Sequence, residues 1–161
     1  MPEPRQRPGR SKQDYGTPSI VLAAVRRLMH VSAFALDAAA SQENAVASRY
    51  YTIVQNGLLQ PWDDDGVTWW NPPYGQCGHW AAKANAEAAL GRVSAGLIPA
   101  SVGSHWWRKW VHQRAHVKFL NGRVTFAGCT APFPKDVALA IFGDPVRWPA
   151  GYDVWRWRPD A

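Results

Sequence analysis

The run Asn-Pro-Pro-Tyr at residues 71–74 constrains this chain more than any other feature. It follows Val-Thr-Trp-Trp at residues 67–70, an apolar pattern that predicts a short buried strand. The motif would then lie at the carboxyl end of a strand, which is the edge where open α/β sheets bind ligands. The alternative is a simple turn, because Asn-Pro and Pro-Pro dipeptides are common in turns.

The chemistry of these residues predicts a site for a planar amino group. Asn71 offers a side-chain carbonyl oxygen, and Pro72 offers a main-chain oxygen without an N–H group of its own. Together the two oxygens can accept both hydrogens of an exocyclic NH2 group. Tyr74 adds a flat ring on which a heterocycle can stack. This combination suits the methylation of an amino nitrogen.

Length and composition favour one folded domain. The chain has 161 residues, of which 47% are hydrophobic, and it contains 10 tryptophans. We expect a disordered basic tail at residues 1–13, one domain at 14–148 and a C-terminal tail at 149–161. Two cysteines suit neither an all-cysteine zinc site nor a disulfide scaffold, and we see no signal peptide or membrane span. We therefore expect a cytoplasmic protein.

The charge balance favours an anionic partner. The net charge is +6 and the isoelectric point is about 9.7, which favours nucleic acid first. A basic surface without such a partner is the alternative. We expect no metal site, because the histidines are scattered and the acidic run at 63–65 is typical of a solvated loop.

Hydrophobic periodicity predicts helices and strands that alternate along the chain. Thr17 is expected as the N-cap and Pro18 as the first residue of the first helix. The predicted helices cover residues 18–30, 77–90 and 104–114, and the predicted strands cover 33–38, 67–70, 92–98, 117–120, 124–126 and 137–142. This alternation indicates an α/β fold whose sheet is covered on both faces.

Residues 105–114 interleave aromatic and cationic side chains. One interpretation is a DNA-facing element in which Arg108, Lys109 and Arg114 contact phosphates and a tryptophan acts as a wedge or stacking plate. The alternative is an amphipathic helix whose tryptophans lie in the core and whose charges are solvated. Arg123, between two predicted strands, either contacts DNA or pairs with an acid.

The motif alone is a weak signal of a protein family, but further segments in a fixed order along the chain make the signal more specific. Together with residues 71–74, they resemble the small Dam-like DNA N6-adenine methyltransferases of phages and prophages. The resemblance extends over about residues 13–143. The other matching segments are Asp-Tyr-Gly-Thr-Pro at 14–18, Asp-Ala-Ala-Ala-Ser at 37–41, Arg-Tyr-Tyr-Thr at 49–52, Leu-Ile-Pro-Ala at 97–100, Gly-Arg-Val-Thr-Phe at 122–126 and Ala-Pro-Phe-Pro at 131–134.

The resemblance implies a Rossmann-like methyltransferase fold that uses S-adenosylmethionine (SAM) and acts on DNA, in the bacterial host cytoplasm if phage-encoded. Its sheet would be mixed and mostly parallel, with helices on both faces. An amino-terminal segment would close over the cofactor, and a first-strand loop would face its methionine end. The implied cofactor residues are Asp14, Tyr15, Thr17, Pro18, Asp37, Ser41 and Asn44, and the implied adenine-holding residues are Asn71, Pro72, Pro73 and Tyr74.

The chain departs from the family pattern in three places. The loop at 37–41 lacks a Gly-x-Gly sequence. Asn56 precedes Gly57 where relatives often carry an acid, so the acid that binds the ribose or adenine of SAM is open, with Asp63 as the candidate. Lys135 stands where a small residue is commoner.

The implied reaction is direct methyl transfer to adenine N6 after the base is flipped out of the duplex. Cys77 follows the motif in no Pro-Cys arrangement, which disfavours methylation of a cytosine carbon. Other substrates that offer a planar NH2 group, RNA or a protein glutamine amide, remain alternatives. A further alternative is a non-catalytic DNA-binding protein on a decayed methyltransferase fold.

Overall fold

The computed structural model describes residues 16–159. The predicted tail at 1–13, together with Asp14 and Tyr15, lies outside them. The elements in chain order are α1 (Ser19–Met29), β1 (Leu36–Asp37), β2 (Val67–Trp70), η1 (Tyr74–Gln76), α2 (Cys77–Ala89), β3 (Val93–Pro99), η2 (Trp107–Val111), β4 (His116–Leu120), β5 (Val137–Phe142) and β6 (Gly151–Trp155).

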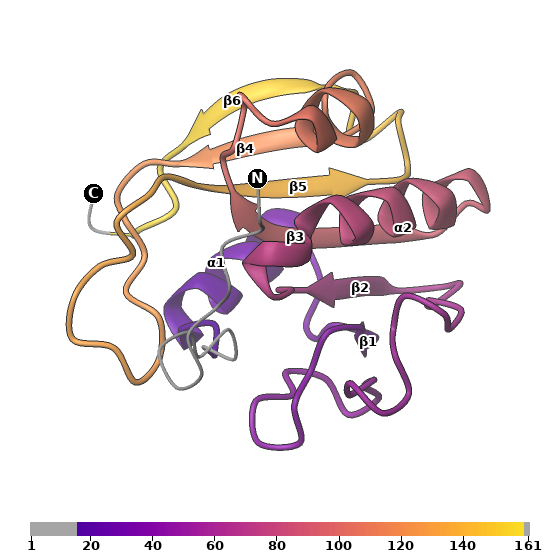
Figure 1. Ribbon diagram of the computed structural model, residues 1–161, viewed down its shortest axis with the longest axis horizontal. Coiled ribbons are helices and arrows are strands. Elements are labelled where there is room, and N and C mark those ends of the chain that lie inside the picture. Colours follow the sequence, from indigo (N-terminus) through magenta and orange to yellow (C-terminus); the bar gives the residue numbers. More distant parts are fainter. Residues whose placement is uncertain (1–15, 160–161) are drawn as a thin grey trace, which may run out of the picture.

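A six-stranded sheet in the order β1-β2-β3-β5-β4-β6 forms the centre of the molecule (Figure 1). The pairs β1–β2, β2–β3 and β4–β6 are parallel, whereas β3–β5 and β5–β4 are antiparallel. Five strands therefore point in one direction and only β5 is reversed. The mixed α/β class expected from the sequence is confirmed.

The core consists of two clusters of buried side chains. The first joins Val21 and Val25 of α1 to Trp69, together with alternate residues of β3 and β5 such as Leu97 and Leu139. The second holds α2 side chains, Trp70 and the intervening strand residues. Successive side chains of a strand point to opposite faces, so the sheet divides its apolar residues between the two clusters.

Sequence reasoning missed one strand and predicted another that does not form. Residues 151–155, expected to belong to a tail, form β6, which pairs with β4 from His116 to Leu120. Its middle residues are exposed, so no alternation of buried positions marked them as a strand. Residues 124–126 form no strand, and the N–H of Phe133 instead donates to the carbonyl of Val124 across the loop that joins them.

Two other elements are shorter than predicted. The strand expected at 33–38 is reduced to Leu36–Asp37. The helix expected at 104–114 becomes a π-helical turn, because the chain is extended at His112 and left-handed at Gln113. No helix among residues 16–159 is long and apolar enough to cross a membrane.

Candidate active site

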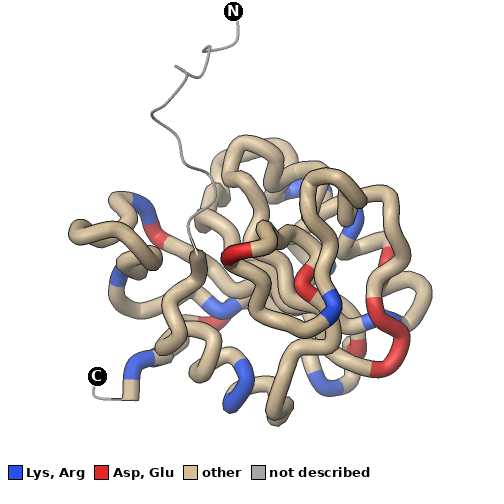
Figure 2. The backbone as a smooth tube through the Cα atoms, turned by 90° about the horizontal axis from the view of Figure 1, so that it is seen from below, with Lys and Arg blue, Asp and Glu red and all other residues tan. Residues whose placement is uncertain are grey.

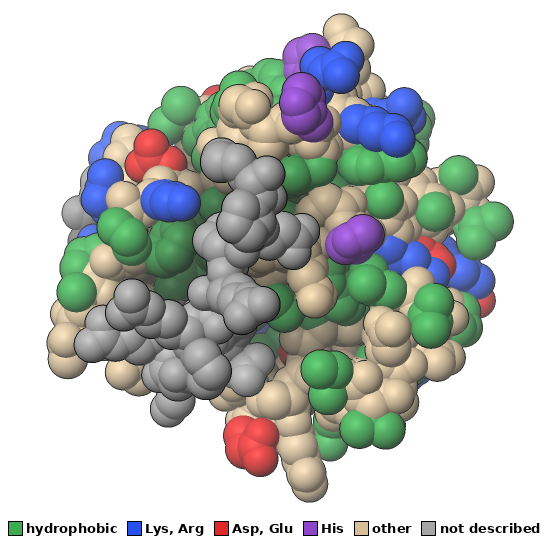
Figure 3. Space-filling model, viewed as in Figure 1, with side chains coloured by type: hydrophobic (Ala, Val, Ile, Leu, Met, Phe, Trp, Pro, Cys, Tyr) green, Lys and Arg blue, Asp and Glu red, His purple; other side chains and the backbone are tan. Residues whose placement is uncertain are grey.

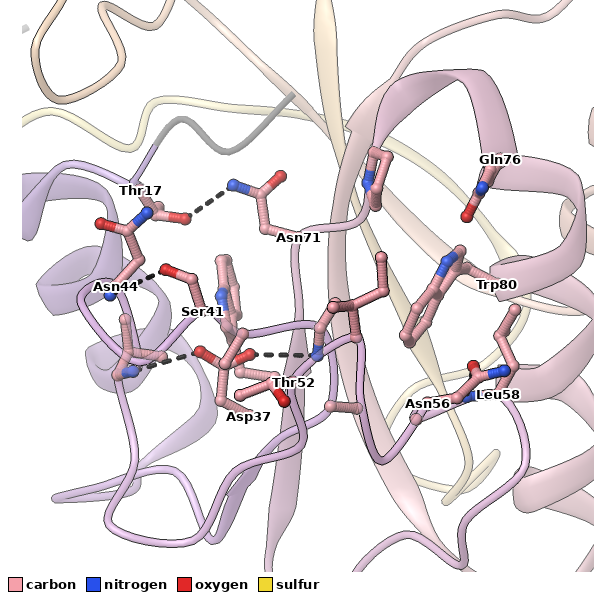
Figure 4. Close-up of a pocket in the computed structure, with 18 of the residues that line it drawn as sticks. Thr17, Asp37, Ser41, Asn44, Thr52, Asn56, Leu58, Asn71, Gln76 and Trp80 are labelled. Atoms are coloured by element: carbon pink, nitrogen blue, oxygen red, sulfur yellow. Dashed lines mark hydrogen bonds between the residues drawn. The ribbon is translucent and has the colours of Figure 1, made fainter. Parts of the chain in front are cut away.

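A cleft opens at the carboxyl ends of β1 and β2 (Figure 4). Segments far apart in the sequence meet there because the two parallel strands are neighbours and end at the same edge. The lining residues fall in four stretches, 16–17, 37–46, 52–58 and 69–80. In Figure 4, Thr17, Asn71 and Asp37 lie on one side of the cleft, with Asp37 below the other two, and Gln76 and Trp80 lie on the other side.

Asp37 provides a buried carboxylate at the base of the cleft. It ends β1 and is 4% exposed. The backbone N–H groups of Ala39 and Val46 donate to its two oxygens at 3.3 and 3.1 Å. Burial raises the pKa of Asp37 to about 6, and these two hydrogen bonds oppose the rise. The carboxylate is therefore well placed to interact with a cation that enters the cleft.

The Asp37 loop makes a close approach without a glycine of its own. Its alanines line the cleft. The glycine is in the facing segment, at Gly57, where a Cβ atom would collide with the carbonyl oxygen of Ala38. Farther along the loop, the Ser41 hydroxyl accepts a hydrogen bond from the backbone N–H of Asn44 at 3.1 Å, and both residues line the cleft.

Asn71 brings its amide into the same cleft from the end of β2. Its Nδ2 donates to Oγ1 of Thr17 at 2.9 Å. Thr17 does not cap α1 as predicted: Pro18 is the N-cap, and no side chain forms a capping hydrogen bond at that end. Pro73 also lines the cleft, whereas Pro72 is buried and Pro18 is not among the lining residues.

Tyr74 lies beside the cleft and does not line it. Its ring packs edge-to-face against Phe126 and Phe133, with centroids 6.1 and 5.4 Å away. Its hydroxyl is buried without a hydrogen-bond partner. Burial, with the nearby Cys77, raises the pKa of Tyr74 well above its ordinary value, so the phenol is neutral.

The structure does not bring Asp63 to the cleft. Its carboxylate accepts from the backbone N–H groups of Gly66 and Asp65, at 2.7 and 2.9 Å, and pairs with Arg49 at 3.2 Å. These N–H groups, with Arg49 beside them, lower the pKa of Asp63. Asp63 therefore organises its own turn, the short-range role that aspartate commonly has in loops.

Several cleft residues had no role in the sequence analysis: Thr52, Ile53, Leu58, Gln76 and Trp80. Asn56, which the sequence analysis named only as a departure from the family pattern, also lines the cleft. Its backbone is in the left-handed conformation, with a φ of 58°. Its Oδ1 accepts from the N–H of Leu58 at 3.2 Å. The Asn-Gly pair signals such a turn. Trp80 lies in the first turns of α2 and Gln76 is the residue just before that helix, so the helix predicted after the motif was the signal for both.

Residues 105–114, the cationic segment, contain both core and exposed side chains. Trp107 is buried, whereas Arg108, Lys109 and Arg114 are exposed. Lys109 Nζ and Arg114 Cζ lie 5.0 and 5.8 Å from the ring centroid of the half-buried Trp110. In Figure 3, histidine, lysine and arginine side chains gather at the upper edge of the molecule.

Arg123 lies apart from these cations, because it follows the end of β4 whereas η2 precedes its start. Its main-chain oxygen accepts from Arg158 at 2.8 Å. Lysine and arginine positions are otherwise spread over several sides of the chain (Figure 2). Among residues 16–159, no three His, Cys, Asp or Glu side chains are grouped to hold a metal ion.

A sequence model of the family DNA N-6-adenine-methyltransferase (Dam) matches residues 6–139. The chain belongs to this family. The match contains every stretch that lines the cleft and ends within β5, so β6 lies beyond it.

The Dam family chain is also similar to a DNA N-6-adenine-methyltransferase of Escherichia phage T1. The two are 29% identical over 90 residues, which make up 56% of this chain and 38% of the phage T1 protein. The matched part therefore spans well under half of that relative.

Proposed function

We propose that this protein is a SAM-dependent DNA adenine N6-methyltransferase. One observation carries the proposal: the Asp37 carboxylate and the Asn71 amide end adjacent parallel strands and line the same cleft. The first suits a cationic methyl donor and the second suits an amine that receives the methyl group. Membership of the Dam family supports the same activity.

The residues of the cleft fit SAM. No cationic side chain among residues 16–159 pairs with the buried Asp37 carboxylate, so an ammonium or sulfonium group nearby would relieve its cost of burial. Ser41 and Asn44 would hold the methionine end beside it. At the other end, Trp80 has a buried Nε1 without a hydrogen-bond partner, and Asn56 and Leu58 line the wall. When bound, SAM supplies an electrophilic methyl group.

The chain's own contribution to the reaction is to hold and polarise the amine. The lone pair of an exocyclic NH2 group is delocalised into its ring, which makes it a poor nucleophile. Asn71 Oδ1 and the Pro72 carbonyl would accept its two hydrogens and stabilise the positive charge that develops on nitrogen. As the bond between nitrogen and the methyl carbon forms, the bond from that carbon to sulfur would break with its electron pair left on sulfur, and the nitrogen would then release one proton to solvent. Fixing the nitrogen in line with the methyl group, about 3 Å away, adds the contribution of proximity.

The thiol next to the motif does not suit covalent catalysis. Cys77 is buried, and burial raises its pKa to about 12. A protonated, inaccessible thiol cannot attack a pyrimidine ring, so methylation of a cytosine carbon is disfavoured.

DNA would reach the cleft with its target base flipped out. Arg108, Lys109 and Arg114 are exposed cations suited to phosphate contacts. Because Tyr74 packs against Phe126 and Phe133 beside the cleft, its ring would have to turn toward the cleft before a base could stack on it. We also propose the Rossmann-like arrangement, which is supported by the division of α1 and α2 between the two core clusters.

The test is to incubate the full-length protein with SAM labelled on the methyl group and with unmethylated DNA, RNA or cell extract. We expect label in DNA that digests to N6-methyladenine, and none with the Asn71→Ala variant. Label found only in RNA or protein would show that RNA or protein, and not DNA, is the substrate. DNA binding without SAM binding would favour the non-catalytic alternative.

A further inference from the structure

Three cations from separate parts of the chain lie at the edge of the sheet where the cleft opens. Because β5 alone is reversed, that edge holds the ends of β4 and β6 and the start of β5. Arg123 follows β4 by three residues, Lys135 precedes β5 by two and Arg158 follows β6 by three. Figure 1 shows the β4–β5 loop, residues 121–136, and the chain after β6 on the side toward which β2 points.

We infer that these three residues, the edge cations, form a surface that holds the DNA duplex beside the target base. The inference rests on the DNA methyl transfer proposed above. All three are exposed, and none forms an ion pair with an acid in the part of the chain that the structure describes. Phosphates are the partner that such charges fit, because each contact releases counterions from the duplex.

The composition of the two segments that carry the edge cations supports this partner. Residues 121–136 and 156–159 contain four lysines and arginines and a single acid, Asp136, which follows Lys135 in the chain. Both segments therefore present an excess of positive charge at the edge where the cleft opens. A surface of this kind attracts a polyanion and raises its local concentration near the cleft.

Arg158 is held in place at the start of the β4–β5 loop. Its Nη2 donates to the carbonyl oxygen of Arg123 at 2.8 Å, and its Cζ lies 4.9 Å from the ring centroid of Trp157. Trp157 is 4% exposed, and its Nε1 donates to the carbonyl of Gly122 at 3.3 Å. A guanidinium has five N–H donors, so others remain for a phosphate. A side chain that is already held loses less freedom on binding.

The β4–β5 loop also contacts the residues of the cleft. Phe126 and Phe133 pack against the ring of Tyr74, which belongs to the motif. The N–H of Ala127 donates at 2.9 Å to the carbonyl of Gly16, which lines the cleft. A duplex whose target base enters the cleft therefore has this loop, with two of the edge cations, beside it.

The sheet order gives the separation of the edge cations from the motif. Counted from β2, which the motif follows, β5 is two strand positions away, β4 is three and β6 is four. Neighbouring strands lie about 4.8 Å apart, so the edge cations lie about 10–19 Å along the edge. Phosphates follow one another every ~3.4 Å along each DNA strand. The edge cations should therefore contact phosphates about three to six base pairs from the target base, on one side of it.

The test uses a fluorescently labelled duplex that fixes where the target base lies. Its single adenine stands opposite an abasic site, between two flanks of about 12 G·C pairs each. An unpaired base costs least to flip, so this adenine sets the register without a known recognition sequence. Fluorescence anisotropy with the full-length protein gives the Kd for this duplex and for duplexes in which one flank is cut to about two base pairs.

We expect the wild type to bind about tenfold or more weakly when one of the two flanks is cut. Arg123→Ala with Lys135→Ala should bind the uncut duplex about as weakly as the wild type binds the cut one. Cutting that flank should then cost this double variant less than about threefold, and its salt slope should be lower by about 2. The matched control, Arg26→Ala with Arg27→Ala in the last turn of α1, should keep the dependence on that flank.

A wild type that is indifferent to both flanks would overturn the inference, and so would an Arg123 and Lys135 double variant that keeps the wild-type dependence. Methyl transfer to the same duplex is measured separately with labelled SAM. Flank dependence without N6-methyladenine would refute the proposed function and leave the DNA surface standing. Formation of N6-methyladenine, together with a double variant that binds like the wild type, would refute the surface alone.

Discussion

The two halves of the sheet differ in how they are held. β3 and β5 pair over six residue positions, and every residue of β5 is buried. β1 pairs with β2 over only two, with one bridge from Asp37 to Tyr50 on its other side. The cleft lies in the second half, where turns and side-chain hydrogen bonds replace strand pairing. We infer that stability and activity reside in separate halves and can be changed separately.

The sharpest test of this separation is Asn71→Ala. Removing the amide should lower methyl transfer by about 100-fold to 1000-fold, as the loss of a preorganised polar contact does in other enzymes. The midpoint of thermal unfolding and the Kd for SAM should change little. Near-normal turnover in this variant would contradict the role of Asn71 in the cleft.

The converse change is Leu139→Ala in β5. Leu139 is fully buried, so the cavity should lower the free energy of unfolding by about 2–5 kcal/mol. Urea denaturation measures this loss. Methyl transfer per folded molecule should stay within about threefold of wild type at a temperature where the variant is folded. A large loss of kcat in the folded variant would show that the two halves are coupled.

The protonation of Asp37 should make both the stability of the protein and its affinity for SAM depend on pH. The folded pKa of Asp37, about 6, exceeds the ordinary value of 3.8, so the folded state gains protons first as pH falls. Its contribution to stability is therefore fully present below pH 3.8 and is lost as pH rises through 6, in all about 3 kcal/mol. The cationic end of SAM needs the carboxylate, so its affinity should change oppositely and weaken about tenfold between pH 7.5 and 5.

Calorimetric titration across this pH range measures the affinity of SAM and the protons released. Asp37→Asn should bind SAM weakly at every pH and show a flat profile. A wild-type affinity that is equally strong at pH 5 and 7.5 would place the cation of SAM away from Asp37.

The smallest expected effect concerns the cationic segment outside the cleft. Replacing both Arg108 and Lys109 by alanine should weaken DNA binding at low salt and reduce the salt slope by about 2. The matched control replaces Arg26 and Arg27 by alanine, which removes the same amount of charge from the last turn of α1. An equal change in both double variants would mean that overall charge, and no particular surface, attracts DNA.

Sequence patterns were most informative where one stretch of chain carries its own signal. The strand at Val67–Trp70 and the helix that follows the motif formed nearly as predicted, because burial and periodicity are local properties. β6 escaped notice because its exposed residues form a strand only through pairing with β4. Asp63 was predicted as a cofactor residue but lies outside the cleft, because its carboxylate accepts hydrogen bonds from N–H groups of its own turn.

The sequence by itself determined the chemistry available: an amide and two prolines after a buried strand, and an aspartate at the end of another. Tertiary structure alone decided which groups meet. It placed Thr17 against Asn71, brought Asn56 and Trp80 to the cleft wall, and packed Tyr74 between two phenylalanines. The reason is that the sequence specifies each side chain directly, whereas side chains tens of positions apart come close only when parallel strands end at the same edge of the sheet.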